Sequence, residues 1–506
     1  MSRQTFQGVN PLTGENIGPA IVESTQSDVA AAIARADAAK TTLGQSSPKQ
    51  RATLLRAIAT AIDGAKDELI ATAHAETALS LPRLTGEVAR TVIQIKAFAT
   101  MVETGVHLNP VIDLADPNFA PVARPDLRKA NQPYGVVAVF AASNFPFAFS
   151  VLGGDSASAL AAGCPIVVKA HPSHPFTSQL TYEAVTRGIK AAGFSPDIFA
   201  IVQGTNPEIT SWLAKDPAVT GIGFTGSGLV GKLLLKFSQA RPVPIPVYAE
   251  MGSLNPVFIT PSALTSGEDV LAKAAMDSAM LGSGQFCTKP GILVVPADAS
   301  GDAFIAEVEK YVATQQVAPL LNKGIATRYK DAIFKLRSSL GLNSLLGQEN
   351  EAGFGVTPTI FVTEWGKAHS ELLEEHFGPT SVIIRAPYTE FVAVAKSMEG
   401  QLTATIHATT SEEVSELVEQ LTQLAGRVIW NGFPTAVSVT AAQHHGGQWP
   451  ASSTQTTSVG LDAIYRFVRP VAFQNFPDSQ LPPALQNSNP FAIERKVNGE
   501  RSREEL

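Results

Sequence analysis

Short apolar runs alternate with amphipathic stretches through the middle of the chain. Each run has the length of a buried strand, and each following stretch has the apolar spacing of a helix. Strands that alternate with helices favour a parallel sheet covered by helices, so this region predicts a doubly wound α/β unit. The strand and helix pairs are 135–140 with 155–162, 165–169 with 178–192, 198–202 with 207–214, and 219–224 with 229–239.

A second α/β pattern begins near Asn255. It contains predicted strands at 292–295 and near Ile360 and Val382, which again indicate a parallel sheet. Its predicted helices are 268–281, 303–315 and 411–425.

The remaining segments differ in character from the two α/β patterns. Residues 28–101 have helical spacing throughout, whereas 109–133 carries five prolines and reads as an extended arm. We expect the tail, 469–506, to be a surface segment with a frayed end because it is rich in Pro, Asn and Gln and then charged.

Composition narrows the possible partners. The 506 residues carry a net charge of −7 and form no basic stripe, so neither nucleic acid nor a membrane is expected as a partner. Two cysteines give no disulfide framework, and the N-terminus lacks the apolar core of a signal peptide. We therefore expect a cytoplasmic protein. The nine histidines show no metal-ligand spacing, so no metal site is predicted.

Cys287 is the first candidate for chemistry. It follows Gly284-Gln285-Phe286, where a glycine-containing loop can present a thiol, although cysteine is also common as a small buried hydrophobe. Cys164 opens an apolar run and fits that inert interpretation. A free thiol is mostly protonated at neutral pH, so Cys287 as a nucleophile needs help from neighbouring groups.

Several polar residues follow predicted strands, where ligands of parallel sheets bind. Gly226 to Gly231 match GxGxxG and open a helix, which suits a phosphate, although such glycines also serve tight turns. Glu250 is either a ribose ligand of that fingerprint or a general base whose pKa partial burial raises. Asn144 could donate to an oxyanion or simply form a turn, and Lys169 could reach a hydroxyl or phosphate.

Together these motifs resemble the aldehyde dehydrogenase superfamily along nearly the whole chain. The resemblance implies an α/β fold with two doubly wound parallel-sheet domains and a small oligomerisation element. The motifs are Ser143-Asn144-Phe145-Pro146-Phe147, Val168-Lys169-Ala170, Phe224-Thr225-Gly226-Ser227 with Gly231, Ala249-Glu250-Met251-Gly252, Gly284-Gln285-Phe286-Cys287, Glu375-His376-Phe377-Gly378-Pro379, and Asn431-Gly432 with Pro434.

The resemblance implies a role for each motif. Cys287 attacks the aldehyde, Asn144 and the Cys287 N–H hold the oxyanion, and Glu250 activates the water that hydrolyses the thioester. Glu250 is then a base and not a ribose ligand. The implied cofactor contacts are Ser143, Lys169, Pro172, Gly226, Ser227, Gly231, Lys232, Glu375 and Phe377.

Pro172 bears on the choice of nicotinamide cofactor. NAD-preferring members of the superfamily often carry a glutamate there, which would repel a 2′-phosphate, and Lys232 could add a favourable charge. We predict that NADP is accepted, with NAD also possible.

Further motifs resemble one bacterial branch, which contains 2,5-dioxovalerate (α-ketoglutaric semialdehyde) dehydrogenases and NADP-dependent fatty aldehyde dehydrogenases. The motifs are Lys169 to Pro175, Gly284 to Gly291, Arg466 to Pro470, and Gln474 to Pro477. The implied reaction is oxidation of 2,5-dioxovalerate to 2-oxoglutarate. Gln448-Trp449 departs from the branch pattern near the expected substrate mouth, which leaves a fatty or other medium- to long-chain aldehyde as the alternative.

Rival functions are a CoA-acylating dehydrogenase, a thiol hydrolase that pairs Cys287 with His444 or His445, and a non-catalytic binding protein. The presence of Glu250 argues against the CoA-acylating enzyme, and Cys287, Glu250 and Asn144 together argue against the binding protein.

The implied domain division is a cofactor-binding domain (1–108 and 134–252), a catalytic domain (253–446), and an oligomerisation arm with the C-terminal segment (109–133 and 447–506). A homodimer or homotetramer is expected. The sequence does not identify the arginine that a dicarboxylate semialdehyde needs for its distal carboxylate.

Overall fold

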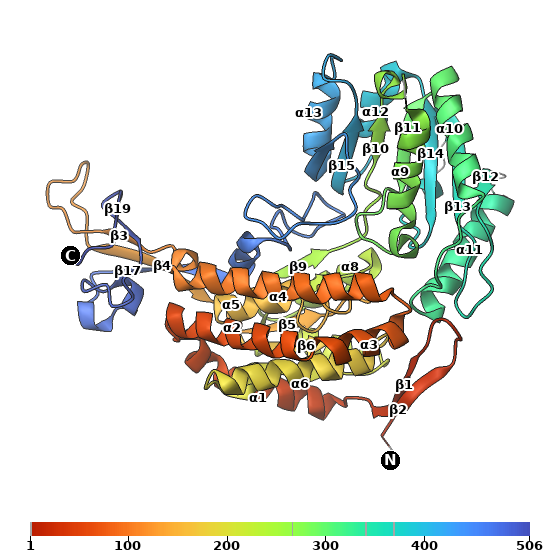
Figure 1. The fold of residues 1–506 in the computed structure, drawn as a ribbon. Coiled ribbons are helices and arrows are strands. Elements are labelled where there is room, and N and C mark those ends of the chain that lie inside the picture. The colour runs from red at the N-terminus through yellow and green to blue at the C-terminus, as the bar shows by residue number, and fades with distance from the viewer. Residues whose placement is uncertain (1–2, 266, 340–341, 368–369) are drawn as a thin grey trace.

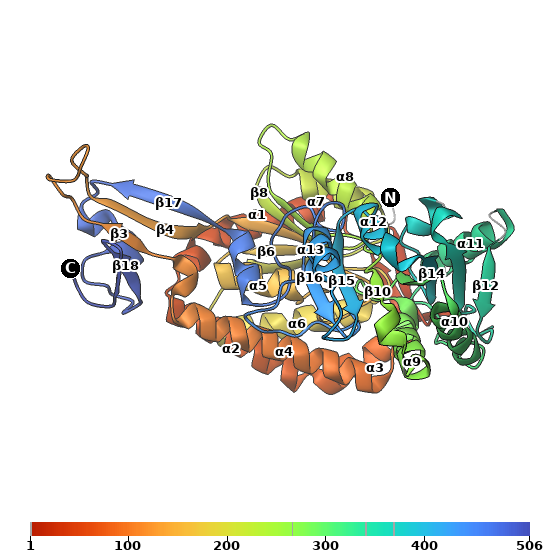
Figure 2. The same ribbon diagram turned by 90° about the horizontal axis from the view of Figure 1, so that it is seen from above.

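The computed structural model describes residues 3–265, 267–339, 342–367 and 370–506. Figure 1 shows three parts. A lower body contains the first sheet and its helices, an upper body is built on the second sheet, and a slender arm projects from the lower body. The view from above in Figure 2 shows the same arm extending away from both bodies.

The first sheet is parallel and has the order β7-β6-β5-β8-β9. Val137 and Val139 of β5 pack with α2 to α6 on one face, whereas Val136 and Ala138 pack with α1, α7 and α8 on the other. This alternation shows that the sheet is doubly wound, as predicted. The strands are β5 (Val136–Phe140), β6 (Ile166–Lys169), β7 (Phe199–Val202), β8 (Val219–Thr225) and β9 (Val247–Glu250).

The first two helices of this body begin where the sequence supplies capping side chains. Thr25 and Asp28 form a capping box at the start of α1, and Ser47 and Gln50 form one at the start of α2. The helices are α1 (Gln26–Gly44), α2 (Pro48–Gly64), α3 (Lys66–Thr77), α4 (Leu81–Glu103), α5 (Gly154–Ala162), α6 (Pro175–Ala191), α7 (Glu208–Lys215) and α8 (Gly228–Gln239). A hairpin of β1 (Thr5–Val9) and β2 (Asn16–Val22) adjoins α6.

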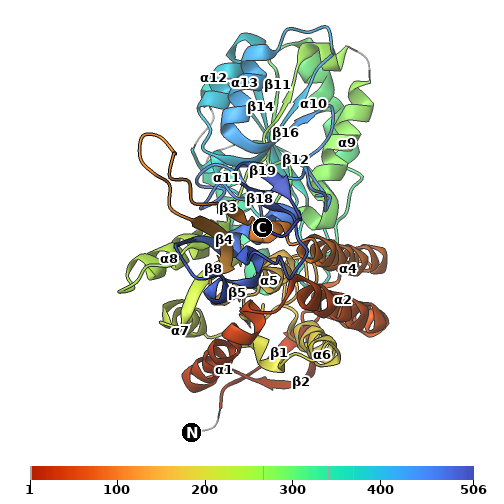
Figure 3. The same ribbon diagram turned by 90° about the vertical axis from the view of Figure 1, so that its left-hand side faces the viewer.

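The second sheet has the order β12-β13-β14-β11-β10-β15-β16, and all pairs are parallel except β12 with β13. Val257 and Ile259 pack with α9 and α10, whereas Phe258 packs with α11 to α13. Figure 3 shows α9 and α12 on opposite sides of this sheet. The strands are β10 (Val257–Ile259), β11 (Ile292–Pro296), β12 (Asn343–Leu346), β13 (Thr359–Glu364), β14 (Thr380–Ala386), β15 (Gln401–His407) and β16 (Ala425–Trp430).

The helices of the second body are α9 (Glu268–Met280), α10 (Ala299–Val312), α11 (Lys323–Ser339), α12 (Phe391–Lys396) and α13 (Ser415–Leu424). The α/β fold class with parallel sheets is therefore confirmed. The antiparallel edge strand β12, helix α11 and strands β15 and β16 were not predicted. No helix among the described residues is long and apolar enough to cross a membrane.

The arm is a third sheet with the order β17-β4-β3-β18-β19. The predicted frayed tail is wrong, because the tail supplies β17 to β19 and the Arg495 side chain is buried among backbone carbonyls of its own segment. Residues distant in sequence thus share one sheet. The strands are β3 (Val111–Asp113), β4 (Leu127–Pro133), β17 (Val468–Gln474), β18 (Arg495–Val497) and β19 (Glu500–Ser502).

Residues 451–453, which precede β17 in the chain, form hydrogen bonds with the end of β9 in the first sheet. The N–H of Met251 donates to Ala451 at 2.8 Å, and the N–H of Ser453 donates to Ala249 at 2.9 Å. We keep the division into cofactor-binding, catalytic and oligomerisation parts as a proposal, in which the arm's C-terminal part starts at β17 and not at residue 447.

Candidate active site

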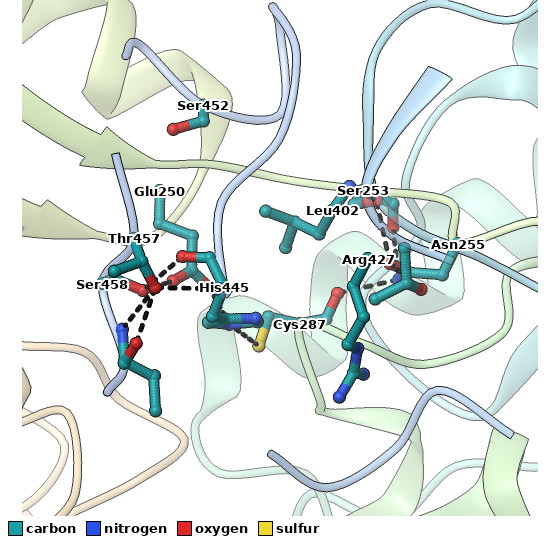
Figure 4. Close-up of polar contacts among 12 residues, drawn as sticks. Glu250, Ser253, Asn255, Cys287, Leu402, Arg427, His445, Ser452, Thr457 and Ser458 are labelled. Carbon is teal, nitrogen blue, oxygen red and sulfur yellow. Dashed lines mark hydrogen bonds and ion pairs between the residues drawn. The ribbon is translucent and has the colours of Figure 1, made fainter. Parts of the chain in front are cut away.

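The loop that carries Cys287 lies between α9 and β11. Gly282, Ser283 and Gly284 have φ angles of 58°, 58° and 69°, so the chain turns sharply before the cysteine. A Cβ on Gly284 would lie 2.1 Å from the Gly378 carbonyl oxygen, so the backbones are in contact there. Asn255 holds the other side of the loop, because its Nδ2 donates to the Cys287 carbonyl at 2.8 Å (Figure 4).

Asn144 joins the carboxyl end of β5 to the same loop. Its buried Nδ2 donates to the carbonyl of Gln285 at 2.8 Å, and the Phe145 and Phe286 rings meet edge to face with centroids 5.0 Å apart. The hydrogen bond to Gln285 uses one of the two amide protons. Two independent contacts therefore bring the segment of Asn144 and the loop of Cys287 together.

Glu250, at the end of β9, reaches Cys287 through a small polar cluster (Figure 4). Its Oε2 accepts a hydrogen bond of 2.6 Å from Ser458, and its Oε1 lies 3.0 Å from His445 Nε2. The same His445 nitrogen lies 3.6 Å from the Cys287 sulfur. The donor and acceptor atoms of Glu250, His445 and Cys287 all lie within 4.8 Å of one another.

The pKa values of Glu250 and Cys287 move apart. Burial and the Glu250 charge raise the pKa of the Cys287 thiol well above its ordinary value. Burial opposes ionisation of Glu250 too, but hydrogen bonds and charge from His445 and Ser458 outweigh it and hold the pKa of the carboxyl below its ordinary value. The expectation that burial raises the Glu250 pKa is thus wrong. The pair rests as thiol and carboxylate, so the proton must leave the thiol when it attacks.

The sequence did not indicate the position of His445 beside Glu250. It offers His445 only as a possible partner of Cys287 in a thiol hydrolase. A hydrogen bond to the Glu250 carboxylate requires the proton on Nε2, because a carboxylate only accepts. Nδ1 has no hydrogen-bond partner within the described part of the chain. His445 therefore donates to Glu250 and contacts the thiol from the side.

The same three residues supply the sulfur, nitrogen and oxygen donors that zinc accepts. Sequence spacing gave no sign of this set, because Glu250, Cys287 and His445 lie far apart in the chain. A zinc ion there would occupy the thiolate, so the set is compatible with a nucleophile only when it is free of metal.

Glu375 and Lys289 form a second charged group beside the loop. Lys289 Nζ donates to the carbonyls of His376, Gly378 and Thr380 at 2.7, 3.1 and 2.8 Å, and burial lowers its pKa to about 8. Burial raises the pKa of Glu375 to about 7. A Cβ on Gly252 would lie 2.3 Å from the Glu375 carboxylate, so Glu375 covers the residues that follow Glu250.

The glycine fingerprint lies at the carboxyl end of β8. Ser227 is the N-cap of α8, and the N–H of Gly226 donates to the Glu250 carbonyl at 3.0 Å. Gly226 and Ser227 are exposed, whereas Gly231 is buried against Met251. The α8 N-terminus is therefore open to solvent near the site, which suits a phosphate group.

The other predicted cofactor residues lie along the same crevice or near it. Lys169 ends β6, donates to the Gly204 carbonyl at 2.9 Å, and has a pKa that burial lowers to about 8. Pro172 lies between β6 and α6, and Lys232 lies 5.8 Å from the ring centre of Trp449. Partly buried Ser143 and Phe377 flank Asn144 and Gly378 respectively.

The chain matches the model described as "Aldehyde dehydrogenase family" over residues 1–469. It is 41% identical to alpha-ketoglutaric semialdehyde dehydrogenase 2 of Azospirillum brasilense, over 98% of this chain and 96% of that protein. It is 37% identical to alpha-ketoglutaric semialdehyde dehydrogenase of Acinetobacter baylyi, over 98% of this chain and 95% of that protein.

A solved structure agrees on the fold. The chain resembles glyceraldehyde-3-phosphate dehydrogenase of Methanocaldococcus jannaschii, complexed with NADP, with a TM-score of 0.80 and 20% identity over 94% of this chain and 99% of that one. The order of motifs and the family match lead to one conclusion: the chain belongs to the aldehyde dehydrogenase family.

Proposed function

We propose that the protein oxidises 2,5-dioxovalerate to 2-oxoglutarate with a nicotinamide cofactor, by way of a thioester on Cys287. The observation that carries the chemistry is the convergence of Cys287, Glu250 and His445 within 4.8 Å, on a loop to which Asn144 is also bound. The two relatives named for α-ketoglutaric semialdehyde support the substrate.

The first step is addition of the thiol to the aldehyde. The sulfur of Cys287 bonds to the carbonyl carbon, and Glu250 accepts the thiol proton because it is an ionised carboxylate beside the thiol. The carbonyl electron pair moves onto the oxygen. The Asn144 amide and the Cys287 N–H are the donors we assign to that oxygen, a contribution of about 3 kcal/mol when such donors are preorganised.

A nicotinamide cofactor bound here would supply the hydride acceptor that the conversion of the Cys287 thiohemiacetal to a thioester requires. The residues fit such a group, because the exposed turn at Gly226 and Ser227 opens onto the N-terminus of α8. We assign the pyrophosphate to this turn, and the ribose to Lys169 and Glu375. Ser143, Gly231 and Phe377 line or support the same crevice.

The second step is hydrolysis. Glu250 first releases the thiol proton to solvent; it then accepts a proton from water as the water oxygen bonds to the thioester carbon, and the carbon–sulfur bond breaks. The proton then returns to the sulfur of Cys287, and the acid leaves. Water and not coenzyme A resolves the thioester in this proposal, because Glu250 is held next to the sulfur by Ser458 and His445.

The choice between nicotinamides depends on residues at the edge of the crevice. Pro172 supplies no carboxylate that would repel a 2′-phosphate, and the exposed ammonium of Lys232 lies near the start of α8. We propose that NADP is accepted at least as well as NAD.

We also propose a homodimer or homotetramer assembled through the arm, in which β17 and β19 end the strand order of the third sheet. Light scattering of the full chain beside a variant that lacks β18 and β19 tests this. A monomer at assay concentrations in the full chain would contradict the proposal.

The decisive experiment compares kcat/KM for 2,5-dioxovalerate, succinic semialdehyde and a long-chain alkanal, measured as reduced nicotinamide without coenzyme A. The highest value is expected for 2,5-dioxovalerate, and Cys287→Ala removes the signal. A higher value for the long-chain alkanal would overturn the substrate, whereas activity that requires coenzyme A would overturn the hydrolytic step.

A further inference from the structure

Three partly buried arginines lie around the loop that carries Cys287. Arg83 and Arg90 come from α4, and Arg427 comes from β16. Each has at least one buried N–H nitrogen without a hydrogen-bond partner among the described residues: Nε and Nη1 of Arg83, Nη2 of Arg90 and Nε of Arg427. A substrate with a distal carboxylate needs such a cation, so each arginine is a candidate for its receptor.

The Arg83 side chain is occupied by contacts with the Asn144 segment and the cysteine loop. Its Nη2 donates to the carbonyl of Asn144 at 2.6 Å, and its guanidinium lies 5.0 and 4.7 Å from the ring centres of Phe145 and Phe286. It therefore fastens the Asn144 segment to the cysteine loop by stacking and hydrogen bonding. The neighbouring Glu87 charge acts on Arg83 as well. We assign Arg83 to positioning and not to substrate binding.

Arg90 and Arg427 approach one short segment from different elements. Arg90 Nε donates to the Val437 carbonyl at 3.4 Å, and Arg427 donates through Nη1 to the Ala436 carbonyl at 3.1 Å and through Nη2 to Pro434. Both side chains donate hydrogen bonds to backbone carbonyls within residues 434–437, so their guanidinium groups lie near each other. Neither of the two forms an ion pair within the described ranges.

Both guanidinium groups also lie near the reacting sulfur. Arg90 lies 5.3 Å from the ring centre of Phe149, and that ring lies 6.3 Å from the His445 ring. In the view of Figure 4, Arg427 lies on the other side of Cys287 from Glu250. Burial lowers the pKa of both arginines; the Glu87 charge opposes this for Arg90, and a thiolate at Cys287 would oppose it for both.

The two arginines are therefore partly buried cations with no ion pair among the described residues, although the Glu87 charge acts on Arg90. A cation in such a setting favours an anion that reaches it. In 2,5-dioxovalerate four carbon–carbon bonds separate the aldehyde carbon from the carboxylate carbon, a span of about 5 Å at about 1.5 Å per bond after allowance for bond angles. A short oxo acid thus places its carboxylate a few ångströms from the sulfur, where these groups lie.

We propose that Arg90 and Arg427 form the subsite that binds the distal carboxylate of a short oxo-acid semialdehyde. This rests on the proposed function, because a carboxylate substrate gives the subsite its ligand. Arg90 offers its free Nη2 and Arg427 its free Nε, so the carboxylate is held between α4 and β16 while the aldehyde meets Cys287. The adjacent 2-oxo group is an additional acceptor for the same donors.

The test replaces each arginine by glutamine and measures the ratio of kcat/KM for 2,5-dioxovalerate to that for pentanal, an uncharged aldehyde of equal length. Loss of a charge-assisted hydrogen bond predicts that the ratio falls about tenfold to hundredfold in Arg90→Gln and in Arg427→Gln. Arg90→Lys and Arg427→Lys keep the charge and restore part of the ratio. Arg187→Gln, an exposed arginine of α6, is the matched control in which the ratio is unchanged.

A binding measurement separates this proposal from the proposed function. Glutarate and 2-oxoglutarate are titrated calorimetrically into Cys287→Ala protein, with and without the arginine substitutions. Weaker binding by at least about tenfold in the substituted proteins supports the subsite, even if the wild type oxidises long-chain alkanals better and the proposed substrate is wrong. An unchanged ratio together with unchanged binding overturns the subsite, even where 2,5-dioxovalerate is the best substrate.

Discussion

The proposed reacting groups and the proposed cofactor-binding turn at the start of α8, called here the platform, differ in their contacts. The reacting groups are fixed by hydrogen bonds within the protein, whereas the platform faces solvent. Cys287 lies in a loop fixed by Asn144, Asn255 and the backbone of Gly378, and Glu250 is fixed by Ser458 and His445. The platform at Gly226, Ser227 and Lys232 is exposed. The difference teaches that the proposed reacting groups are preorganised by the protein alone, whereas the proposed phosphate site would be completed by its ligand. Substitutions should therefore cost far more in the first region than in the second.

Removal of the nucleophile tests the fixed region most severely. Cys287→Ala should lower kcat by at least about 10⁴-fold, because no other group can form the thioester. Cys164→Ala is the matched control, since that sulfur is buried and donates to the Phe467 carbonyl away from the site. Equal losses in the two variants, measured as nicotinamide reduction, would mean that the assay reports folding and not chemistry.

Removal of the base should separate the two chemical steps. Glu250→Gln should slow steady-state turnover by about 10²- to 10⁴-fold, while some rapid initial nicotinamide reduction remains. Burial alone still raises the pKa of Cys287 in this variant, so the initial phase should quicken as pH rises and the thiol ionises. Stopped-flow absorbance between pH 6 and pH 9 measures both phases, and a pH-independent initial phase would contradict the assignment of Glu250 as proton acceptor.

Substitution of His445 tests whether the fixed contacts tune the base. His445→Leu removes a group that lowers the pKa of Glu250, so that pKa should rise. The base is then protonated over a wider acidic range, and kcat should fall about tenfold near pH 6 and less near pH 8. His444→Leu is the control from the neighbouring position. If the acidic side of the plot of kcat against pH does not shift in His445→Leu, His445 contributes packing and does not lower the pKa of Glu250.

Substitutions on the exposed platform should change cofactor preference and little else. Pro172→Glu should lower kcat/KM for NADP about tenfold with a small effect on NAD, because the added carboxylate repels the 2′-phosphate. Lys232→Ala should lower the value for NADP about twofold, as expected for an exposed charge. A strong preference of the wild type for NAD would contradict both expectations.

Much of the fold was predictable because its signals are local. The alternation of apolar runs with helical spacing gave the first parallel sheet, and the apolar residues of β5 do divide between two helical layers. The arm was not predictable in this way. Its strands β3 and β18 are short and distant in sequence, and the proline-rich and polar composition of both segments indicates loops when each is considered alone.

The site was predictable in part for the same reason. Cys287, Glu250 and Asn144 each stand in a recognisable local setting, a glycine-containing loop or a strand end. Lys289 gave no such signal, because a lysine that donates to three carbonyls cannot be told from an exposed lysine in the sequence.

The sequence by itself determined the family and the α/β class, and it singled out Cys287 as the proposed nucleophile, because these depend on motifs and on periodicity within short stretches. Only the tertiary structure decided how the site is charged. His445 stands 195 residues from Glu250 in the chain, yet it lies 3.0 Å away and reverses the expected direction of the Glu250 pKa. Arg90 and Arg427 likewise meet only through folding. Electrostatic effects depend on distance in space and on burial, which no local pattern records.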